Sequence, residues 1–326
     1  MQYNDTTLLT IMIPTYNRNH KVLLSVERLV SQLNNNVKLI IFDNCSDIAV
    51  SETIGHIKHE NIEVVRHSSN IGMSANFISC FEACQTEWMW LLGDDDPPAL
   101  DAVDNIISDI CSYNDYSFIN YKNPYAIKRQ SNFTTQGLEG LIEGMDDFGN
   151  ILFISVGLYH LSKLKPNKRF ANQLSYSLAP HLVYLFTGLQ EDAKVLFSNK
   201  VLHDFSLRTT TPDEDWSWLS LSLSIPVLYE IPLNIGQKAK EKFAELVLTH
   251  VKKPSQIYGI IEQPNTINMP LYEKRYLLRQ IYFRSLLYKG FDRYFLSWLW
   301  CDLKLRIKYA LKKRDSTYNI ERYKRI

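Results

Sequence analysis

Cysteine is scarce in this sequence, and its spacing excludes the usual cysteine-based scaffolds. The chain has 5 cysteines among 326 residues, which are Cys45, Cys80, Cys84, Cys111 and Cys301. Their number is odd, and no two of them form a C-x-x-C pair. A disulfide framework of the secreted type is therefore not expected, and we predict reduced, buried thiols in a cytoplasmic protein.

Long apolar runs are also missing. The N-terminus lacks the basic and then apolar pattern of a signal sequence, and no uninterrupted apolar run is long enough to span a bilayer. A content of 45% hydrophobic and 12% aromatic residues still supports a sizeable core. Length and composition together predict a soluble or peripheral protein made of one large domain, or of a domain with an appendage.

The chain has almost no net charge, at +1, but its charges are unevenly distributed. Residues 271–326 include 15 basic and 5 acidic residues, which gives this region a net charge of +10. The rest of the chain carries a net charge of −9. An acidic body joined to a basic C-terminal region indicates that the two parts have different surroundings or partners.

The stretch that carries most of the chemistry is residues 87–98. Residues 88–92 form a short apolar run that predicts a strand buried on both faces. Asp94, Asp95 and Asp96 follow this run directly. The strand would therefore present three carboxylates at its carboxyl end, which is the edge where open α/β sheets bind ligands.

Two prolines after the carboxylates end the strand, and a proline suits the start of the helix that we predict over residues 99–110. Adjacent carboxylates repel one another, so without a cation some of their pKa values should be raised. Oxygen ligands of this kind suit Mg²⁺ or Mn²⁺ bound together with substrate phosphates. A solvated acidic turn is the alternative interpretation of the same residues.

Strands and helices alternate through the N-terminal half. The predicted strands are residues 8–13, 37–42 and 62–65, and the predicted helices are residues 22–33, 51–57 and 74–84. Alternation at these lengths predicts an α/β fold with a mostly parallel, doubly wound, Rossmann-like sheet. Asp43 follows the second predicted strand, so another carboxylate is expected at the ligand-binding edge.

Four sequence blocks carry a resemblance to a known family. They are Ile11-Met12-Ile13-Pro14-Thr15-Tyr16-Asn17-Arg18, Phe42-Asp43-Asn44-Cys45-Ser46-Asp47, Asn70-Ile71-Gly72 with Asn76, and Leu91-Leu92-Gly93-Asp94-Asp95-Asp96. In order and spacing, over roughly residues 8–120, they resemble the family 2 glycosyltransferases of the GT-A fold. The Trp-Leu-Leu-Gly-Asp-Asp-Asp form is most similar to the abequosyltransferase-like branch of bacterial surface-polysaccharide enzymes.

The resemblance implies a role for each block. The residues that would bind the nucleotide sugar are Pro14, Thr15, Tyr16, Asn17, Arg18, Asp43, Asn44, Asn70, Gly72, Asn76 and Asp94. Among them, Asp43 takes the place of the carboxylate that hydrogen-bonds the base. The acidic cluster takes the place of the DxD metal site, with Asp95 and Asp96 in catalytic roles. Two alignments of that motif are open: Asp95 with Asp96 in support, or Asp94 with Asp96.

The resemblance also implies the reaction. Such enzymes move a sugar, with inversion, from a nucleotide diphosphate sugar to a hydroxyl of an acceptor, and use Mn²⁺ or Mg²⁺. The branch implies a glycan acceptor linked to a lipid, such as a polyprenyl diphosphate, in O-antigen or capsule synthesis. We accordingly predict a GT-A domain over residues 1–235, with a nucleotide-sugar half up to about residue 120 and an acceptor half after it. A helical region would follow over residues 236–326.

We predict a strand at residues 116–120, where the first half ends, and in the acceptor half a polar insertion at residues 122–145 and an acceptor-lining segment at residues 151–159. An inverting transfer needs a general base. His181 stands where the family places an Asp or Glu at a helix start, and histidine titrates near neutrality. A structural histidine bonded to backbone is the alternative. Other candidates for the base are Glu191 and Asp192, or Asp213 and Asp215 in a Thr/Pro-rich loop.

The region from residue 271 onward is helical by pattern and mixes aromatic with basic residues. Residues 304–314 form a basic amphipathic stretch. Aromatic side chains at headgroup depth, with cations toward anionic lipid, predict an interfacial helix at the cytoplasmic face of the inner membrane. Helices packed on the catalytic domain with a solvated basic face are the alternative. The acidic body and the absence of a nucleic-acid-binding motif argue against nucleic acid.

Three other functions are alternatives to the transferase. A nucleotidyltransferase needs a Gly-rich loop with a basic residue after the first strand, and Pro14-Thr15-Tyr16-Asn17 contains no glycine. A processive polysaccharide synthase needs transmembrane helices and a Gln-x-x-Arg-Trp motif, which this sequence lacks. A non-catalytic GT-A-fold protein that binds a glycan or a partner is the remaining alternative.

Overall fold

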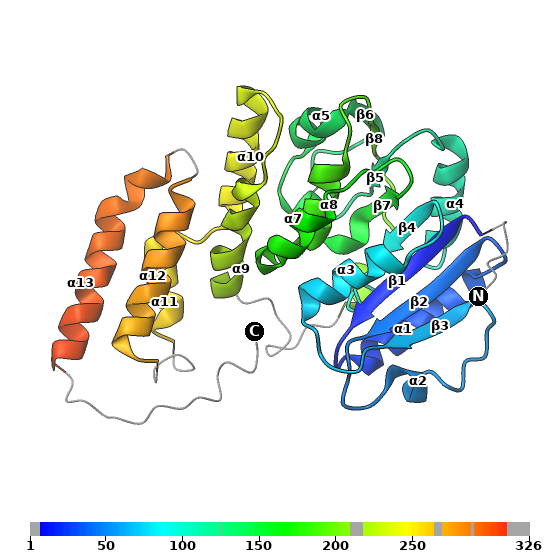
Figure 1. The fold of residues 1–326 in the computed structure, drawn as a ribbon, viewed down its shortest axis with the longest axis horizontal. Coiled ribbons are helices and arrows are strands. Elements are labelled where there is room, and N and C mark those ends of the chain that lie inside the picture. Colours follow the sequence, from blue (N-terminus) through cyan, green and yellow to red (C-terminus); the bar gives the residue numbers. More distant parts are fainter. Residues whose placement is uncertain (1–6, 125, 209–217, 264–268, 288–289, 312–326) are drawn as a thin grey trace. The chain divides into compact units, whose positions relative to one another are not determined.

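The computed structural model describes residues 7–124, 126–208, 218–263, 269–287 and 290–311. The chain separates into two compact units (Figure 1). Unit 1 comprises residues 1–175, 179–214 and 233–236, and unit 2 comprises residues 176–178, 215–232 and 237–326. Short segments thus alternate between the units, and the division at residue 235 into a transferase domain and a C-terminal region stays a prediction.

Unit 1 is built on one mixed sheet, with the strand order β3-β2-β1-β4-β7-β5-β8-β6. The strands are β1 (Leu9–Thr15), β2 (Val37–Asp43), β3 (Ile62–Arg66), β4 (Trp88–Leu91), β5 (Phe118–Asn120), β6 (Phe133–Gln136), β7 (Gly157–His160) and β8 (Lys194–Phe197). Strands β3, β2, β1 and β4 are parallel neighbours. Strand β7 runs antiparallel to β4 and β5, and β6 runs antiparallel to β8. The predicted α/β class with a mostly parallel sheet is therefore confirmed.

The helices of unit 1 follow the predicted alternation. They are α1 (Asn19–Leu29), η1 (Val30–Gln32), α2 (Val50–Thr53), α3 (Met73–Ala83), α4 (Ala102–Ser112), α5 (Gly137–Gly144), α6 (Gly149–Leu152), η2 (Ile154–Val156), α7 (Lys168–Gln173), α8 (Pro180–Gly188) and η4 (Phe205–Leu207). The short helix η3 (Ser175–Ser177) spans the junction between the units. Figure 1 shows α3 and α1 on opposite faces of the parallel strands.

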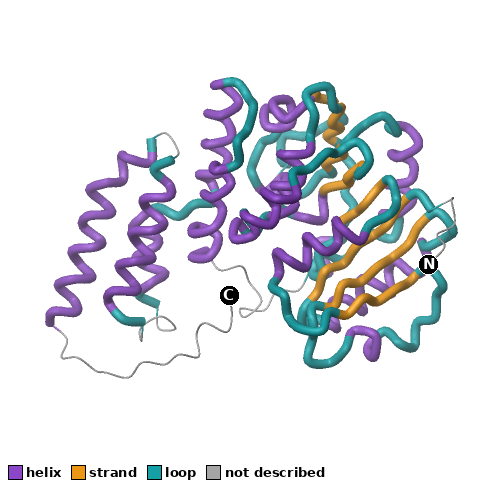
Figure 2. The backbone as a smooth tube through the Cα atoms, in the orientation of Figure 1, coloured by secondary structure: helices purple, strands orange, loops and turns teal. Residues whose placement is uncertain are grey.

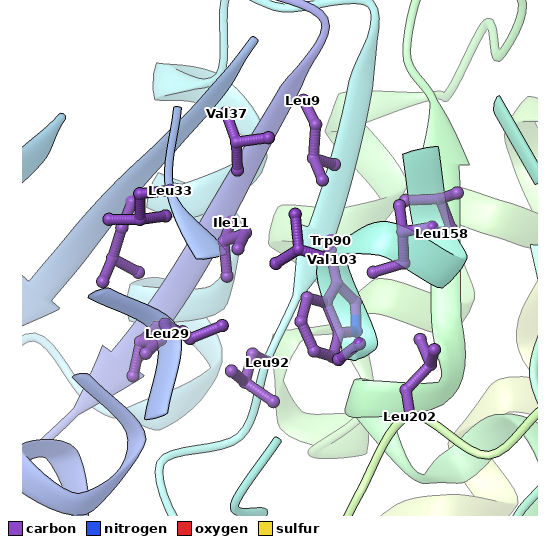
Figure 3. Packing of buried hydrophobic residues seen from close by; sticks show 14 of the residues in the cluster. Leu9, Ile11, Leu29, Leu33, Val37, Trp90, Leu92, Val103, Leu158 and Leu202 are labelled. Atoms are coloured by element: carbon purple, nitrogen blue, oxygen red, sulfur yellow. The ribbon is translucent and has the colours of Figure 1, made fainter. Parts of the chain in front are cut away.

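Every second residue of β1 contributes its side chain to the main apolar core. Leu9, Ile11 and Ile13 are completely buried and join side chains of α1 and α4 in one apolar cluster. Figure 3 shows Trp90 of β4 at the centre of this cluster, beside Val103 of α4. The indole Nε1–H of Trp90 donates a hydrogen bond to the backbone oxygen of Ser155, at 2.7 Å. A buried tryptophan needs such a partner, and the bond fixes β4 against residues 154–156.

Two predicted elements differ from the structure. The helix expected from residue 99 begins at Ala102, because the chain before it pairs with a distant segment: Pro98 forms a β-bridge with His203, and the amide of Ala99 donates to the oxygen of Leu202. The polar insertion expected at residues 122–145 contains strand β6 and helix α5, so much of it belongs to the sheet edge. Phe133 of β6 stacks on Phe197 of β8, with ring centroids 4.7 Å apart.

The described residues of unit 2 form helices joined by loops, as Figure 2 shows by colour. Its helices are α9 (Trp218–Ser224), η5 (Ile225–Glu230), α10 (Gln237–Thr249), α11 (Pro254–Ile261), α12 (Leu271–Ser285), η7 (Phe291–Tyr294) and α13 (Phe295–Leu311). The predicted helical C-terminal region is confirmed. Among the residues that the structure describes, no helix has both the length and the apolar character needed to cross a membrane.

Helices α12 and α13 are joined by a buried carboxylate. Asp302 of α13 accepts hydrogen bonds from Nε of Arg275 at 2.7 Å and from Nε of Arg306 at 3.0 Å. Burial alone would raise the pKa of Asp302, but the hydrogen bonds and charge of Arg275, with Arg306, hold it below its usual value. The carboxylate is therefore expected to be ionised at neutral pH and to stabilise the helix pair.

Replacing Asp302 by asparagine should lower the free energy of unfolding of unit 2 by about 2 kcal/mol. This is less than the loss for a fully buried ion pair, because the Arg306 side chain is 55% exposed. A depressed carboxyl pKa stabilises the fold above the unfolded-state pKa, so the difference from wild type should shrink as the pH falls below about 4. Urea unfolding at neutral and acidic pH measures it, with exposed Asp292→Asn as control. Equal stabilities at neutral pH would contradict the role of Asp302.

Candidate functional site

The acidic cluster lies at the edge of the sheet where the sequence predicted it. Asp94, Asp95 and Asp96 follow β4, Thr15 ends β1 and Asp43 ends β2. Strands β2, β1 and β4 are parallel neighbours, so their carboxyl ends meet at one edge. The structure therefore brings together carboxylates that lie about fifty residues apart in the chain.

Asp94 is used for internal contacts. Its side chain accepts a hydrogen bond from Oγ1 of Thr15 at 2.8 Å and one from Nη1 of Arg18 at 3.0 Å, through different oxygens. Burial raises the pKa of Asp94, and the nearby charge of Arg18 opposes that shift. Since both oxygens are occupied, Asp94 anchors the loop after β1 to the loop after β4.

The two oxygens of Asp96 differ in their hydrogen bonds. Its Oδ2 accepts a hydrogen bond from the Ser155 hydroxyl at 2.6 Å, and the same hydroxyl accepts the amide of Gly93 at 2.8 Å. The other oxygen, Oδ1, is buried without a hydrogen-bond partner among the described residues. Burial, with the charge of Asp95, raises the pKa of Asp96 to about 7. The pKa values of Asp94 and Asp96 are thus both raised, and burial contributes more to the rise than the predicted repulsion by Asp95 does.

Gly93 is required at this turn by close packing. A Cβ atom at this position would lie 2.9 Å from Oδ2 of Asp96 and 3.1 Å from Oγ of Ser155. Any side chain would therefore push these two groups apart. This close packing explains why residue 93 is a glycine.

Asp95 is the most exposed member of the cluster, and two arginines flank it. Nη2 of Arg208 lies 3.3 Å from Oδ2 of Asp95, and Nε of Arg208 lies 3.6 Å from Oδ1 of Asp96. Nη1 of Arg18 lies 3.9 Å from the same oxygen of Asp95. The Arg208 guanidinium lies 4.9 Å from the ring centroid of Phe153. Two positive charges therefore partly offset the charge of the acidic cluster in this structure.

The residues present fit a divalent cation only in part. Among the described residues, no group of three His, Cys, Asp or Glu side chains is arranged to hold a metal ion. The oxygens that remain are those of Asp95 and Oδ1 of Asp96, and Arg208 lies against Oδ2 of Asp95 and Oδ1 of Asp96. One or two carboxylates suffice for Mg²⁺ or Mn²⁺ when water and substrate phosphates supply the other ligands. This geometry favours the alignment that uses Asp95 with Asp96, and it requires Arg208 to move aside.

Replacing Arg208 by glutamine should therefore strengthen Mn²⁺ binding at about pH 8 by at least about fivefold, because a competing cation is removed from the ligands. Titration calorimetry without nucleotide measures the affinity. The exposed Arg169→Gln variant is a matched control with the same loss of charge. Unchanged or weaker Mn²⁺ binding by Arg208→Gln alone would show that Arg208 does not compete for these carboxylates.

Asp43 is completely buried, and its carboxylate organises the loop after β2. Oδ1 accepts the amide of Ser46 at 2.8 Å, and Oδ2 accepts the amide of Val50 at 3.2 Å and Nη1 of Arg66 at 2.6 Å. Burial alone would raise the pKa of Asp43, but these hydrogen bonds hold it below its usual value. A hydrogen bond from Asp43 to a nucleotide base would have to replace one of these bonds, and it stays a prediction.

The other predicted nucleotide-binding residues lie on adjacent loops. Nδ2 of Asn44 donates to Oδ1 of Asn70 at 2.8 Å, and the amide of Gly72 donates to the same oxygen at 2.8 Å. Asn76 of α3 is buried and donates to the backbone oxygen of Phe42 at 3.1 Å. The loops after β2 and β3 are thus joined through amide side chains.

The loop after β1 meets the loop after β2 in the same way. The amide of Asn17 donates to Oγ of Ser46 at 2.9 Å, and the Tyr16 ring is exposed. Asn17 and Cys45 both adopt left-handed backbone conformations, with φ of 54° and 63°. For a cysteine this conformation is uncommon, and such strain is concentrated at functional loops.

His181 is enclosed in the protein. It lies in the first turn of α8 with only 1% of its surface exposed, and its Nε2 lies 3.1 Å from the backbone oxygen of Ile151, to which it donates. Burial lowers the pKa of His181 to about 4. The ring also meets Phe77 of α3 edge-on. These contacts correspond to the structural alternative, because the ring does not reach solvent where an acceptor hydroxyl could meet it.

The remaining candidates for the base are placed as follows. Glu191 and Asp192 are exposed in the turn between α8 and β8, and Oε1 of Glu191 accepts Nδ2 of Asn234 at 3.4 Å. Asp213 and Asp215 lie outside the described residues. The base therefore stays unassigned in the part of the chain that the structure describes.

Sequence reasoning missed two members of this site. Ser155 was expected only within an acceptor-lining segment, and Arg208 was not singled out. Ser155 lies 59 residues from Asp96, and Arg208 lies 113 residues from Asp95. An arginine immediately before the predicted Thr/Pro-rich loop was the one signal that the sequence offered for Arg208.

Comparisons with known proteins find similarity in the N-terminal half. Residues 10–157 match the family model of glycosyl transferase family 2. This segment contains strands β2 to β6, all of β1 but its first residue, and the whole acidic cluster. Residues 10–157 are therefore similar to glycosyltransferases of family 2. None of the curated protein sequences matches the chain significantly.

Solved structures agree with this fold. S. aureus TarS residues 1–349 in complex with UDP is 14% identical with a TM-score of 0.57, covering 97% of this chain and 95% of that chain. The same protein with UDP-GlcNAc is 10% identical with a TM-score of 0.57, covering 95% and 93%. A Pyrobaculum calidifontis mannosyltransferase with GDP-Man and Mn²⁺ has a TM-score of only 0.46 at 9% identity, covering 94% and 88%. The TarS similarity establishes the GT-A fold, and the abequosyltransferase-like branch is not confirmed.

Proposed function

We propose that this chain is an inverting glycosyltransferase that moves a sugar from a nucleotide diphosphate sugar to a hydroxyl of a glycan, with Mn²⁺ or Mg²⁺ as cofactor. The observation that carries the proposal is the acidic cluster at the carboxyl edge of the sheet, inside the segment that matches family 2. The residues that contribute to the family resemblance thus also form a carboxylate cluster at the ligand-binding edge of the sheet.

The proposed metal ligands are Asp95 and Oδ1 of Asp96. A divalent cation held there would neutralise the diphosphate leaving group. Ser155 holds the Asp96 carboxylate in place, because its hydroxyl binds the other oxygen of Asp96 and also the amide of Gly93. Asp94 holds Thr15 and Arg18 and so keeps the loop after β1 beside the cluster. Preorganised groups of this kind stabilise charge that develops in the transition state.

The loops after β1, β2 and β3 are proposed to bind the nucleotide. They contribute Thr15, Tyr16, Asn44 and Asn70 at the same edge as the cluster. The exposed Tyr16 ring offers a stacking surface for a base or ribose. The TarS structures contain UDP and UDP-GlcNAc, so uridine diphosphate is the first nucleotide to test.

The acceptor and its location belong to the same proposal. We place the enzyme at the cytoplasmic face of the inner membrane, acting on a lipid-linked glycan of the O-antigen or capsule type, such as a polyprenyl-diphosphate-linked saccharide. The sequence resemblance and the basic, aromatic C-terminal region support this assignment. A non-catalytic glycan-binding protein is the second candidate, favoured by the arginines that already partly offset the charge of the acidic cluster.

A thermal-shift panel tests the proposal. UDP, CDP, GDP and TDP are each added with and without Mn²⁺, because a ligand of the native state raises apparent stability by about 2.7 kcal/mol at one hundred times its dissociation constant. One nucleotide should raise the melting temperature in the presence of Mn²⁺. The shift should disappear in Asp95→Ala and persist in Asp104→Ala, which removes an exposed carboxylate of α4. No shift with any nucleotide would favour the glycan-binding candidate.

A further inference from the structure

Helix α13 has apolar side chains on two opposite sides. Trp298, Cys301 and Leu305 are buried within unit 2. A second set is exposed, namely Leu296, Leu299, Trp300, Leu303 and Ile307, with exposed fractions between 43% and 76%. We call these five residues the outer face of α13. At 3.6 residues per turn they lie within an arc of about 100°, opposite the buried side.

None of the helices in the described part of unit 2 covers the outer face. Its largest exposed fraction, 76%, is that of Leu296. Figure 1 shows α13 beside α12, which packs against its inner side with α11. A contiguous exposed apolar stripe along about three turns of helix is unusual for a surface that meets only water, and such stripes mark interaction sites.

Basic side chains border the outer face on both sides. Arg306 and Lys304 are exposed, and on the helical projection each lies about 20–40° beyond one edge of the apolar arc. Nζ of Lys304 lies 5.2 Å from the ring centroid of Trp300. The single carboxylate of α13, Asp302, is buried against Arg275 and Arg306. The exposed surface of α13 is thus apolar in the middle, basic at both borders and free of acidic groups.

We propose that the outer face of α13 binds the surface of an anionic lipid membrane. An apolar stripe with a tryptophan at its border and cations on both sides matches the interface between acyl chains and negatively charged headgroups. A second copy of the chain is a poorer occupant. A symmetric pair would bring the basic borders of two copies together, and the outer face offers no carboxylate to pair with them.

This inference deepens the proposed function. It rests on that function in one respect only, namely that the membrane supplies a lipid-linked acceptor. Binding through α13 would hold the enzyme at the surface from which such an acceptor projects. The contact itself needs neither nucleotide nor sugar. Failure of membrane binding is therefore distinguishable from failure of the transferase assignment.

Vesicle co-sedimentation of the full chain tests the inference. Wild type should bind phosphatidylcholine vesicles that contain about 30% phosphatidylglycerol, and bind pure phosphatidylcholine at least about tenfold more weakly. The double variant Leu296→Glu with Leu299→Glu should lose binding to the anionic vesicles by more than about tenfold. Lys304→Gln alone should weaken it by about fivefold, the effect of one cation near such a surface.

The matched control is Leu100→Glu with Ile127→Glu, which places the same charges on exposed apolar residues of unit 1. It should bind anionic vesicles as wild type does. Circular dichroism melts should show that both double variants stay folded. Equal binding by the two double variants would overturn the inference. Light scattering provides a second test. If wild type self-associates and the double variant Leu296→Glu with Leu299→Glu is monomeric, a second copy of the chain occupies the outer face and the inference is overturned.

Discussion

Replacing Asp95 by asparagine should reduce sugar transfer by at least about a hundredfold, the usual loss when a group that stabilises transition-state charge is removed. Asp95 is the exposed carboxylate of the cluster, and its side chain is 18% exposed. Its charge raises the pKa of both Asp94 and Asp96. Removing that charge should leave the folded protein at least as stable as wild type, so lost activity would reflect the site and not the fold.

Asp94→Asn provides the comparison. Asp94 holds Thr15 and Arg18 through its two oxygens, so this variant should lower the free energy of unfolding as well as activity. Urea unfolding and nucleoside diphosphate release, measured on both variants, separate the two roles. If Asp95→Asn kept full activity while Asp94→Asn lost it without loss of stability, the alternative alignment of the metal motif, Asp94 with Asp96, would be correct.

Mn²⁺ binding should depend steeply on pH. Burial and Asp95 raise the pKa of Asp96 to about 7, and a carboxylate must lose its proton to bind a metal. Below about pH 7 the affinity should fall about tenfold for each pH unit, and above it the affinity should level off. Calorimetric titrations between about pH 5.5 and 8 measure this.

The same group affects stability without metal in the opposite direction. A carboxyl group whose pKa is raised by folding keeps its proton in the folded state between about pH 4 and 7, so its contribution to stability falls as the pH rises through that range. Asp96→Asn should remove both pH dependences. Mn²⁺ affinity that does not change between about pH 5.5 and 8 would exclude Asp96 as a ligand.

The sequence predicted those parts of the fold that depend on neighbouring residues. The apolar run before Asp94 is strand β4, and the carboxylates that follow it lie at the edge of the sheet, as do the residues after β1 and β2. Period and composition decide such features locally. The helix predicted from residue 99 began later because Pro98 pairs with His203, a contact that no local pattern contains.

The contacts that complete the candidate site join distant segments. Ser155 reaches Asp96 and Gly93 from the segment before β7, and Arg208 reaches Asp95 from beyond β8. Their positions depend on how β7 and β8 enter the sheet. For His181 the sequence did indicate burial, because its helix, α8, is almost entirely apolar. In the structure this helix is buried along most of its length.

The assignment of the acidic cluster as the donor and metal site is best tested by a release assay. The assay measures nucleoside diphosphate released from sugar nucleotides by the wild-type protein. UDP-, GDP-, CDP- and TDP-sugars are incubated with the chain in Mn²⁺, in Mg²⁺ and in excess EDTA. We expect release from one nucleotide class, dependent on the divalent cation and at least about a hundredfold slower in Asp95→Asn. Release that persists at the same rate in EDTA and in Asp95→Asn would contradict the assignment of the acidic cluster as the donor and metal site.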